Sequence, residues 1–331
     1  MPKIFAYVVH RSGIPDDTSF ELIAAAKAID ATTSPIALVV GLDADLNQVI
    51  DSLRSSYREI WKASNEALAY PNAELVRQAL VKVIPKGSIV LLPHDHFGMD
   101  LAPGLSIQLD TPFVSDVLAI EAEGGTSLRA VRQEFGGAVC SHVSCDISTG
   151  AVITVRPGSF KAQAPLSIDG VVVDKSPEIG ALSARRRYLE TIVPEAGDVD
   201  ITKHNVLVSV GRGIQEKENI VIAEELAEAL GGAVSCSRPV VDAKWLGKSR
   251  QVGSSGKTVK PKVYLACGIS GAFQHLAGLK GSPFIVAINK NAKAPIFQVA
   301  DVGIVDDLIE LLPELTTKVR EMRGAVAGQR T

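Results

Sequence analysis

At 331 residues, the chain is long for one domain and comfortable for two, at roughly 100 to 200 residues per domain. Hydrophobic residues make up 46% of the chain and charged residues 21%, which is typical of a globular protein and argues against a largely disordered chain. The net charge of -3 provides no basic surface of the kind that neutralises phosphate backbones, so nucleic acid is not an expected partner.

The chain shows no sign of secretion or membrane insertion. No apolar run reaches the roughly 18 residues of a membrane span, and the apolar stretch near the N-terminus is too short for a signal peptide. The four cysteines include no C-x-x-C pair, which favours reduced thiols; they are Cys140, Cys145, Cys236 and Cys267. We therefore expect a cytoplasmic protein.

Apolar strand-like runs alternate with amphipathic segments through the first hundred residues. Ser19 is expected to cap the first helix, in which Leu22, Ile23 and Ala26 share one face. The alternation predicts a parallel sheet covered by helices. The expected strands are 3–9, 35–42, 59–63 and 88–92, and the further helices are 46–53 and 73–84.

After Pro112 the pattern changes to short strand-like runs separated by Gly and Ser turns, at 114–122, 129–135, 138–144 and 151–156. These runs predict an antiparallel extension or edge of the sheet. The segment His94, Asp95, His96 contains two imidazoles and a carboxylate, but no third ligand stands at a recognised spacing, so no metal site is expected. The first half is interpreted as a scaffold.

A polar stretch with proline and glycine, 194–200, separates two strongly patterned regions. We therefore predict an N-terminal α/β domain over 1–193, a linker over 194–204 and a C-terminal doubly wound α/β domain over 205–331. The second domain begins with a strand, 205–210, that ends in the triplet G-R-G. A helix over 219–230 follows, closed by Gly231, and a short strand over 233–236 then delivers Ser237 and Arg238 to its C-terminal end.

A buried strand over 263–267 ends in glycine-rich residues, and a helix is expected from about Ala272. The first turn of a helix has unsatisfied N–H groups that bind anions, and Gln274 and His275 fall in that turn. Ligands of open α/β sheets bind beyond the carboxyl ends of the strands. One crevice could therefore collect Arg212, Arg238, Gly271 and Asn289, together with the loop 250–257. Asp307 could cap the last helix, from about Leu308, or bind an adenosine.

Six segments of the second half are shared, in order, with a known family. They are VSVGRGI (208–214), SRPVVD (237–242), QVGSSGK (251–257), GISGAFQHLAG (268–278), VAINK (286–290) and APIFQVADVGIVDDL (294–308). In these segments the chain closely resembles the alpha subunit of electron transfer flavoprotein. The first half resembles the family more loosely, in its βα pattern, in Gly136 and Gly137, and in ITVRPGSF (153–160).

The resemblance implies an electron carrier rather than an enzyme with its own substrate. The C-terminal domain would bind FAD, and a beta subunit would contact the N-terminal domain in a heterodimer. Acyl-CoA-type dehydrogenases would be the electron donors, and a quinone-linked or other redox protein would be the acceptor. The beta subunit would carry AMP, or a second FAD in an electron-bifurcating version of the heterodimer.

Position by position, the resemblance implies a set of FAD contacts in this chain. Pyrophosphate would lie on 270–274, and adenosine on Asn289, Asp307 and Leu308. Arg238, Ser255 and His275 would border the isoalloxazine and tune its charge, as cations or hydrogen-bond donors. The full set is Arg212, Ser237, Arg238, Val252, Gly253, Ser254, Ser255, Ser270, Gly271, Ala272, Phe273, Gln274, His275, Asn289, Asp307 and Leu308.

The chain departs from the family pattern in few places. Val210 replaces a glycine that is common before G-R-G, and Ser254 and Ser255 stand where glutamine and threonine are usual. Ser255 keeps the hydroxyl that would lie near flavin N5. Two further hypotheses remain at this point: a stand-alone dinucleotide-dependent oxidoreductase, and an interaction subunit in which the flavin is structural.

Overall fold

The computed structural model describes residues 2–11, 13–124, 126–135, 139–163, 168–190, 199–281 and 283–328. The chain divides into two compact units, Met1–Glu190 and Thr191–Thr331, and each is described here by itself. Most of the polar stretch 194–200 lies outside the described residues, as do Gly136 and Gly137.

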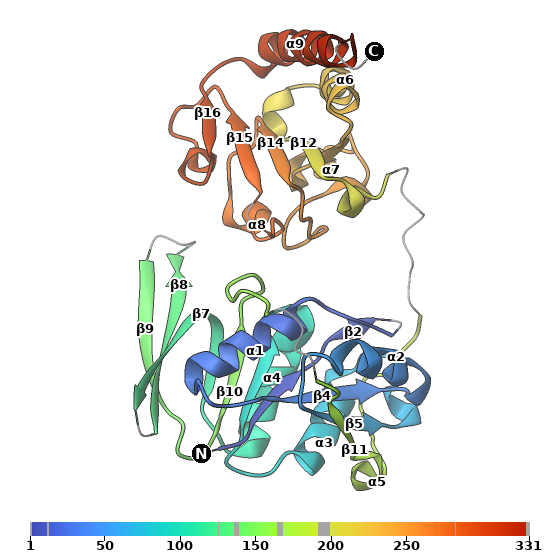
Figure 1. Ribbon diagram of the computed structural model, residues 1–331, viewed down its shortest axis with the longest axis vertical. Helices are drawn as coiled ribbons and strands as arrows, with labels where there is room; N and C mark the ends of the chain where they lie inside the picture. Colours follow the sequence, from blue (N-terminus) through green and yellow to red (C-terminus); the bar gives the residue numbers. More distant parts are fainter. Residues whose placement is uncertain are drawn as a thin grey trace. The chain divides into compact units, whose positions relative to one another are not determined.

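The N-terminal unit is built on a nine-stranded sheet with the strand order β11-β5-β4-β1-β6-β10-β7-β8-β9. The strands from β11 to β7 are parallel, whereas β7, β8 and β9 pair antiparallel and form an arm at one edge (Figure 1). This architecture confirms the predicted parallel sheet with an antiparallel extension. The strands are β1 (Ile4–Tyr7), β4 (Ile36–Gly41), β5 (Glu59–Ser64), β6 (Ile89–Pro93), β7 (Phe113–Gly124), β8 (Ser127–Glu134), β9 (Val139–Asp146), β10 (Ala151–Val155) and β11 (Val171–Asp174), with a small separate hairpin of β2 (His10–Arg11) and β3 (Ile14–Pro15).

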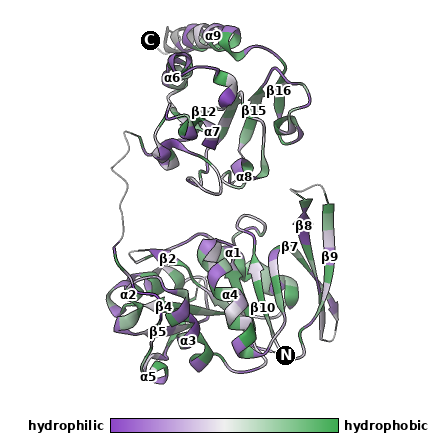
Figure 2. Ribbon diagram, turned by 180° about the vertical axis from the view of Figure 1, so that it is seen from behind, coloured by the Kyte–Doolittle hydropathy of each residue, from purple (hydrophilic) through white to green (hydrophobic). Residues whose placement is uncertain are grey.

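Helices cover both faces of this sheet, because its central strands are apolar on both sides. Leu22 of α1 (Thr18–Ile29) and Val49 of α2 (Asp43–Leu53) belong to the buried cluster on one face. Leu80 of α3 (Ala73–Val83) and Leu105 of α4 (His96–Leu109) belong to the cluster on the other face. Helices α1 and α4 each carry hydrophobic and hydrophilic residues, as expected for a covering layer (Figure 2). The helices are α1 (Thr18–Ile29), α2 (Asp43–Leu53), α3 (Ala73–Val83), α4 (His96–Leu109) and α5 (Ser176–Ile179).

Three sequence-based predictions for this unit were wrong or incomplete. Ser19 does not cap α1, because the helix begins one residue earlier and Asp16 accepts the N–H and O–H of Thr18 instead. Strand β10 was assigned to the antiparallel extension, but it inserts between β6 and β7 and pairs parallel with both. Helix α4 was not predicted; Asp95 caps it by accepting from Gly98 N at 2.6 Å.

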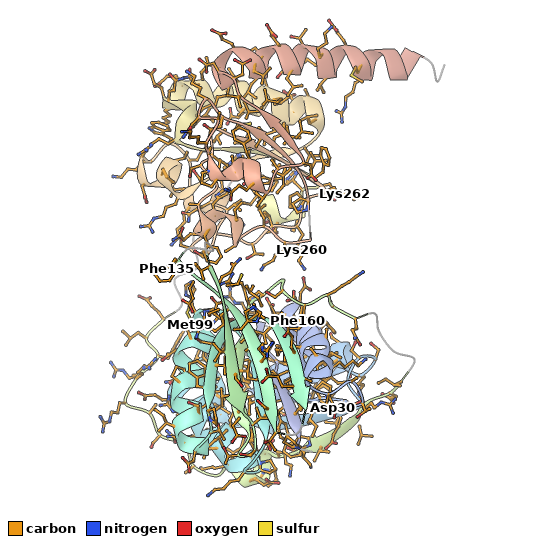
Figure 3. All side chains as sticks on the ribbon, turned by 90° about the vertical axis from the view of Figure 1, so that its left-hand side faces the viewer. Asp30, Met99, Phe135, Phe160, Lys260 and Lys262 are labelled. Atoms are coloured by element: carbon orange, nitrogen blue, oxygen red, sulfur yellow. The ribbon has the colours of Figure 1, made fainter. Side chains whose placement is uncertain are left out.

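The tip of the antiparallel arm exposes an aromatic side chain. Phe135 follows β8 and is 86% exposed, and Figure 3 shows it at the end of the arm (Figure 3). Strand β9 pairs with β8 on one side, and no other strand of the described residues pairs with its outer edge. None of the helices in the described residues is long and apolar enough to span a membrane.

The C-terminal unit is a five-stranded, fully parallel sheet in the order β13-β12-β14-β15-β16. From β12 the chain adds β13 on one side of the sheet, and it then returns to add β14, β15 and β16 on the other side. The carboxyl ends of the neighbouring strands β12 and β14 are therefore the topological switch point. The strands are β12 (Val206–Val210), β13 (Ala233–Cys236), β14 (Val263–Cys267), β15 (Phe284–Ile288) and β16 (Val302–Ile304), and the helices are α6 (Ile220–Leu230), α7 (Arg238–Asp242), α8 (Phe273–Leu276) and α9 (Leu308–Gly328).

The two faces of this second sheet are covered differently. Helices α6 and α9 pack on one face, and their residues Leu226 and Leu312 lie in its buried cluster. The buried cluster on the opposite face draws on loop residues instead, among them Val252, Ile269 and Ile296. Loops that follow the strands therefore build the surface beside the switch point, and they leave a hollow there.

Candidate functional site

A cavity of about 640 Å³ lies at the carboxyl ends of the strands of the C-terminal unit. Its walls come from the loops that follow β12, β13, β14 and β15, so four separate strand ends contribute to one site. The volume falls in the usual range for sites that bind small molecules and cofactors, roughly 300 to 1,000 Å³.

The structure brings together most of the residues that the sequence singled out. The predicted residues that line the cavity are Arg212, Ser237, Arg238, Val252, Gly253, Ser254, Ser255, Ser270, Ala272, Gln274, His275 and Asn289. Four predicted residues are not among the lining residues: Gly271, Phe273, Asp307 and Leu308.

Sequence reasoning missed several wall residues. Gln251 is the first letter of the QVGSSGK motif, inside the loop 250–257 already expected at the crevice, and Ala294 and Pro295 begin the motif 294–308, so motif membership could have identified these three. Asn291 falls between two motifs. Gly213, Pro239, Gly268 and Ile269 likewise adjoin predicted residues. All eight line the cavity: Gly213, Pro239, Gln251, Gly268, Ile269, Asn291, Ala294 and Pro295.

Glycines let the loops after β12 and β14 touch each other directly. A Cβ at Gly211 would lie 2.2 Å from the Gly268 carbonyl oxygen, and one at Gly213 would lie 2.6 Å from Gly268 Cα. Gly213 N donates to Gly268 O at 3.1 Å. The G-R-G triplet is therefore required for close backbone packing at the switch point, and this packing holds Arg212 at the cavity wall.

The helix predicted after β14 is only one turn long. Helix α8 is a single turn, Phe273–Leu276, with Ala272 before it, so the dipole of a long helix is absent from this site. Gly271 has φ +85, and a Cβ there would lie 2.3 Å from Ile296 N. The glycine is needed so that the segment 294–297 can pack against the turn, with Ile296 N donating to Ser270 O at 3.0 Å.

The loop 251–257 packs against α8 and positions a serine hydroxyl. Ser254 N donates to Gln274 O at 2.7 Å, which ties the loop to the turn after β14. Gln251 is 4% exposed, and its side-chain nitrogen donates to Ser255 Oγ at 2.8 Å. Because the serine oxygen accepts this bond, its own proton remains available for an acceptor in the cavity.

His275 is a neutral group at pH 7 rather than a cation. Its side chain is 6% exposed, and burial lowers the pKa of His275 to about 4. Its Nε2 lies 2.7 Å from the hydroxyl of Tyr264 in β14. Of the two tuning roles that the sequence left open for His275, cation or hydrogen-bond donor, the structure favours the donor.

Arg238 carries a positive charge at the rim of the same cavity. It is the first residue of α7, its side chain is 70% exposed, and its Nε lies 3.3 Å from Asp242 Oδ2 one turn later. Arg238 lines the cavity wall together with Arg212.

Asp307 caps the last helix, α9, as the sequence suggested. Its Oδ1 accepts from Ile309 N at 3.0 Å, which caps α9, and its Oδ2 lies 2.7 Å from Lys290 Nζ. The bond from Lys290 helps to hold the pKa of Asp307 below its usual value. Asn289 ties two loops by donating to Ile269 O at 2.9 Å while it lines the cavity.

Two buried thiols lie at the ends of strands next to the cavity. Cys236 ends β13 and Cys267 ends β14, and neither side chain is exposed. Burial raises the pKa of each thiol to about 12. Both are therefore protonated and unreactive at physiological pH.

A doubly wound parallel sheet whose switch point opens on a cavity of this size defines the class: an α/β protein with a site for a nucleotide cofactor. Residues 4–180 match the family model described as electron transfer flavoprotein domain, and residues 200–280 match the one described as electron transfer flavoprotein FAD-binding domain. The second match contains most of the cavity wall.

Full-length relatives agree with these matches. An electron transfer flavoprotein subunit alpha of Thermoanaerobacterium thermosaccharolyticum is 37% identical over 287 residues, covering 86% of this chain and 83% of that protein. The electron transfer flavoprotein subunit alpha of Bacillus subtilis is 33% identical over 317 residues, covering 94% of this chain and 95% of that protein. Protein FixB of Clostridium saccharobutylicum is 33% identical over 329 residues, covering 97% of each.

The chain belongs to the electron transfer flavoprotein alpha-subunit family, and FAD is the cofactor of its C-terminal domain. Among solved structures, a thiamine diphosphate-dependent decarboxylase of Rhodococcus jostii is 10% identical with a TM-score of 0.23, covering 96% of this chain. The chain spans 59% of that structure's length, and a likeness this weak carries no argument.

The cavity fits FAD in its size and in its chemistry. Two arginines give the wall positive charge, which suits an anionic cofactor, and glycines let the backbone approach a ligand closely. A buried imidazole and an oriented serine hydroxyl provide polar groups at fixed places for a ring system. The remaining wall is partly apolar, as a flavin requires.

Proposed function

We propose that FAD lies in this cavity with its pyrophosphate on the turn 270–274 and its adenosine toward Asn289. Arg238, Ser255 and His275 would then border the isoalloxazine. The observation that carries the proposal is the convergence of four strand-end loops on one cavity of about 640 Å³. Contacts of FAD with Gly271, Phe273, Asp307 and Leu308 stay predictions.

Bound FAD supplies one- and two-electron redox chemistry, and the residues of this chain tune and position it. Negative charge on a reduced flavin would be stabilised by the fixed charge of Arg238. The hydroxyl of Ser255, oriented by Gln251, would donate to the ring edge, and the neutral ring of His275 would contribute a dipole rather than a charge.

The chain would work as one subunit of a heterodimer that carries electrons between proteins. Family membership over both units supports a beta subunit as the partner. The exposed Phe135 and the outer edge of β9 are surfaces of the N-terminal unit on which a partner could pack. Acyl-CoA-type dehydrogenases are the proposed donors and a quinone-linked protein the proposed acceptor, in the cytoplasm.

The test is purification of the chain together with its beta subunit. The complex should be yellow, should contain FAD, and should be reduced by an acyl-CoA dehydrogenase and its substrate. One FAD and one AMP per complex identifies a simple carrier, whereas two FAD identify a bifurcating one. A colourless complex that FAD cannot reconstitute would contradict the proposal.

A pair of variants tests the location of the cofactor. Ala272 lines the cavity, so Ala272→Trp should fill it and remove FAD from the complex. Ala243 is exposed in the same unit and does not line the cavity, so Ala243→Trp should retain FAD. Full FAD content in the first variant would place the cofactor elsewhere.

A further inference from the structure

The imidazole of His275 is held from behind by a buried tyrosine. Tyr264 lies inside β14, its side chain is completely buried, and its hydroxyl is 2.7 Å from His275 Nε2. Tyr264 does not line the cavity, whereas His275 does. Because the bond is buried, turning the imidazole would leave two polar groups without partners, at a cost of about 1–3 kcal/mol each.

The phenol of Tyr264 has one proton to contribute to this hydrogen bond. Burial raises the pKa of Tyr264 well above its ordinary value, and this effect outweighs the opposite effect of the Ser209 and Ser235 hydroxyls. The phenol therefore keeps its proton. A neutral phenol can give its single proton to His275 Nε2, which lies 2.7 Å from its oxygen.

The other ring nitrogen carries the imidazole proton. When Nε2 accepts from Tyr264, a neutral imidazole must hold its proton on Nδ1. Burial lowers the pKa of His275, while the backbone of Val252 acts in the opposite direction. Among the described residues, Nδ1 itself is buried without a hydrogen-bond partner, so a proton there can be donated to a ligand in the cavity. The ring is thus oriented through Nε2.

We propose that Tyr264 is a positioning residue of the flavin site, which donates to His275 Nε2, holds the ring as its Nδ1–H tautomer at the cavity wall, and thereby sets the one-electron potential of FAD. This inference rests on the proposed location of FAD in the cavity. A donated hydrogen bond draws electron density from the ring, and this makes the ring edge more positive toward the flavin. Loss of the phenol should therefore make reduction less favourable.

The experiment is a double-mutant cycle in the FAD-loaded complex at pH 8, where the imidazole of His275 is neutral wherever it is present. Tyr264→Phe, His275→Leu and the double variant are compared by their first one-electron potential. Tyr264→Phe should reduce the equilibrium constant for accepting one electron about tenfold, or about 59 mV. In the His275→Leu background the same change should have no effect, because Tyr264 acts through His275.

Tyr57→Phe is the matched control, since it also removes a buried phenol hydroxyl, one that donates to Ser19 O in the other unit. Its potential should equal that of the unmodified complex. An equal shift by Tyr264→Phe in both backgrounds would overturn the inference. A shift by His275→Leu without one by Tyr264→Phe would overturn it while leaving the proposed FAD location intact, and no shift in either would overturn both.

A second measurement uses no variant in the site and decides the matter if Tyr264→Phe does not fold. In spectra of the complex labelled with [15N]histidine, His275 should show a protonated Nδ1 and an unprotonated Nε2 at pH 7. The opposite tautomer would overturn the inference, because Tyr264 would then accept from the ring instead of donating to it.

Discussion

The charge on the cavity wall depends on which of its basic side chains are protonated. Arg212 and Arg238 are cations at any physiological pH, whereas burial keeps His275 neutral. The fixed positive charge beside the proposed isoalloxazine therefore comes from an arginine at the rim, and the buried imidazole acts through its dipole and its tautomer.

Arg238→Ala should leave FAD bound and lower its one-electron potential. A unit charge about 4 Å away contributes about 1 kcal/mol in a well-solvated setting, which suits a side chain that is 70% exposed. That free energy corresponds to about 40 mV for one electron. Arg238→Lys keeps the charge and should retain most of the potential. Spectroelectrochemical titration of the complex checks both variants, and an unchanged potential in Arg238→Ala would remove this residue from the flavin ring.

The stability of the cofactor-free chain should depend on the protonation of His275. Its pKa falls from 6.5 to about 4 in the folded state, so the neutral form is favoured by folding. The stabilisation is complete above about pH 6.5 and is lost as the pH falls toward 4, for a total of about 3 kcal/mol at 1.36 kcal/mol per unit. His275→Gln should remove this slope.

Urea unfolding can follow this change in the C-terminal unit alone. The chain has two tryptophans, Trp61 and Trp245, and they lie in different units. Fluorescence in a Trp61→Phe background reports on the unit that holds His275. A pH profile that is the same in the histidine and glutamine proteins would show that the imidazole is not buried as described.

At the scale of elements, the strand–turn–strand segment from β14 to β15 depends on glycine packing. Gly271 and Gly281 both have positive φ, +85 and +77, but a Cβ at Gly271 would collide with the Ile296 backbone, whereas one at Gly281 would meet Lys260 Cβ at 3.7 Å. Alanine substitutions at these two glycines therefore distinguish the cost of backbone strain alone from the cost of strain plus a steric collision.

Gly281→Ala should cost about 1–2 kcal/mol from the left-handed conformation alone. Gly271→Ala should cost about 3 kcal/mol or more, because the segment 294–297 must also move. The Trp245 signal in urea unfolding measures both values. Since 294–297 carries part of the cavity wall, Gly271→Ala should also weaken FAD binding; equal costs for the two alanines would show that the contact with Ile296 is loose.

Most strands of the two sheets could be predicted because buried parallel strands appear as short apolar runs, although the edge strand β11 was not predicted. Helix α4 could not, since its residues combine apolar side chains on several faces with Gly98, Pro103 and Gly104, and so lack the helical period. Strand β10 was predicted as a strand, but its parallel pairing depends on contacts with β6 and β7 that no local pattern contains.

The site was predictable where residues stand at strand ends, and less so where loops fold back. Arg212, Arg238 and Asn289 follow β12, β13 and β15 directly, and the strand-end rule locates them. The wall residue Gln251 belongs to an irregular loop, and Tyr264 has the sequence pattern of an ordinary core residue of β14. The bond from Tyr264 to His275 appears only when the turn after β14 folds back over the sheet.

At the scale of the whole molecule, each unit has its own sheet and its own two buried clusters. The two family models match these units separately, at 4–180 and 200–280. The residues that line the cavity all belong to the C-terminal unit.

The buried thiols beside the cavity have a consequence for durability. Reduced flavins react with oxygen to give peroxide, and peroxide attacks thiolates, so a thiolate next to the cofactor would be a point of damage. Cys236 and Cys267 are sealed and protonated, and Cys145 is also buried, which leaves Cys140 on β9 as the exposed cysteine. A thiol reagent should therefore modify the native FAD-loaded complex at Cys140 or not at all. Modification of Cys236 or Cys267 before unfolding would show that the cavity wall opens, whereas their protection would keep these two thiols from peroxide formed at the proposed flavin.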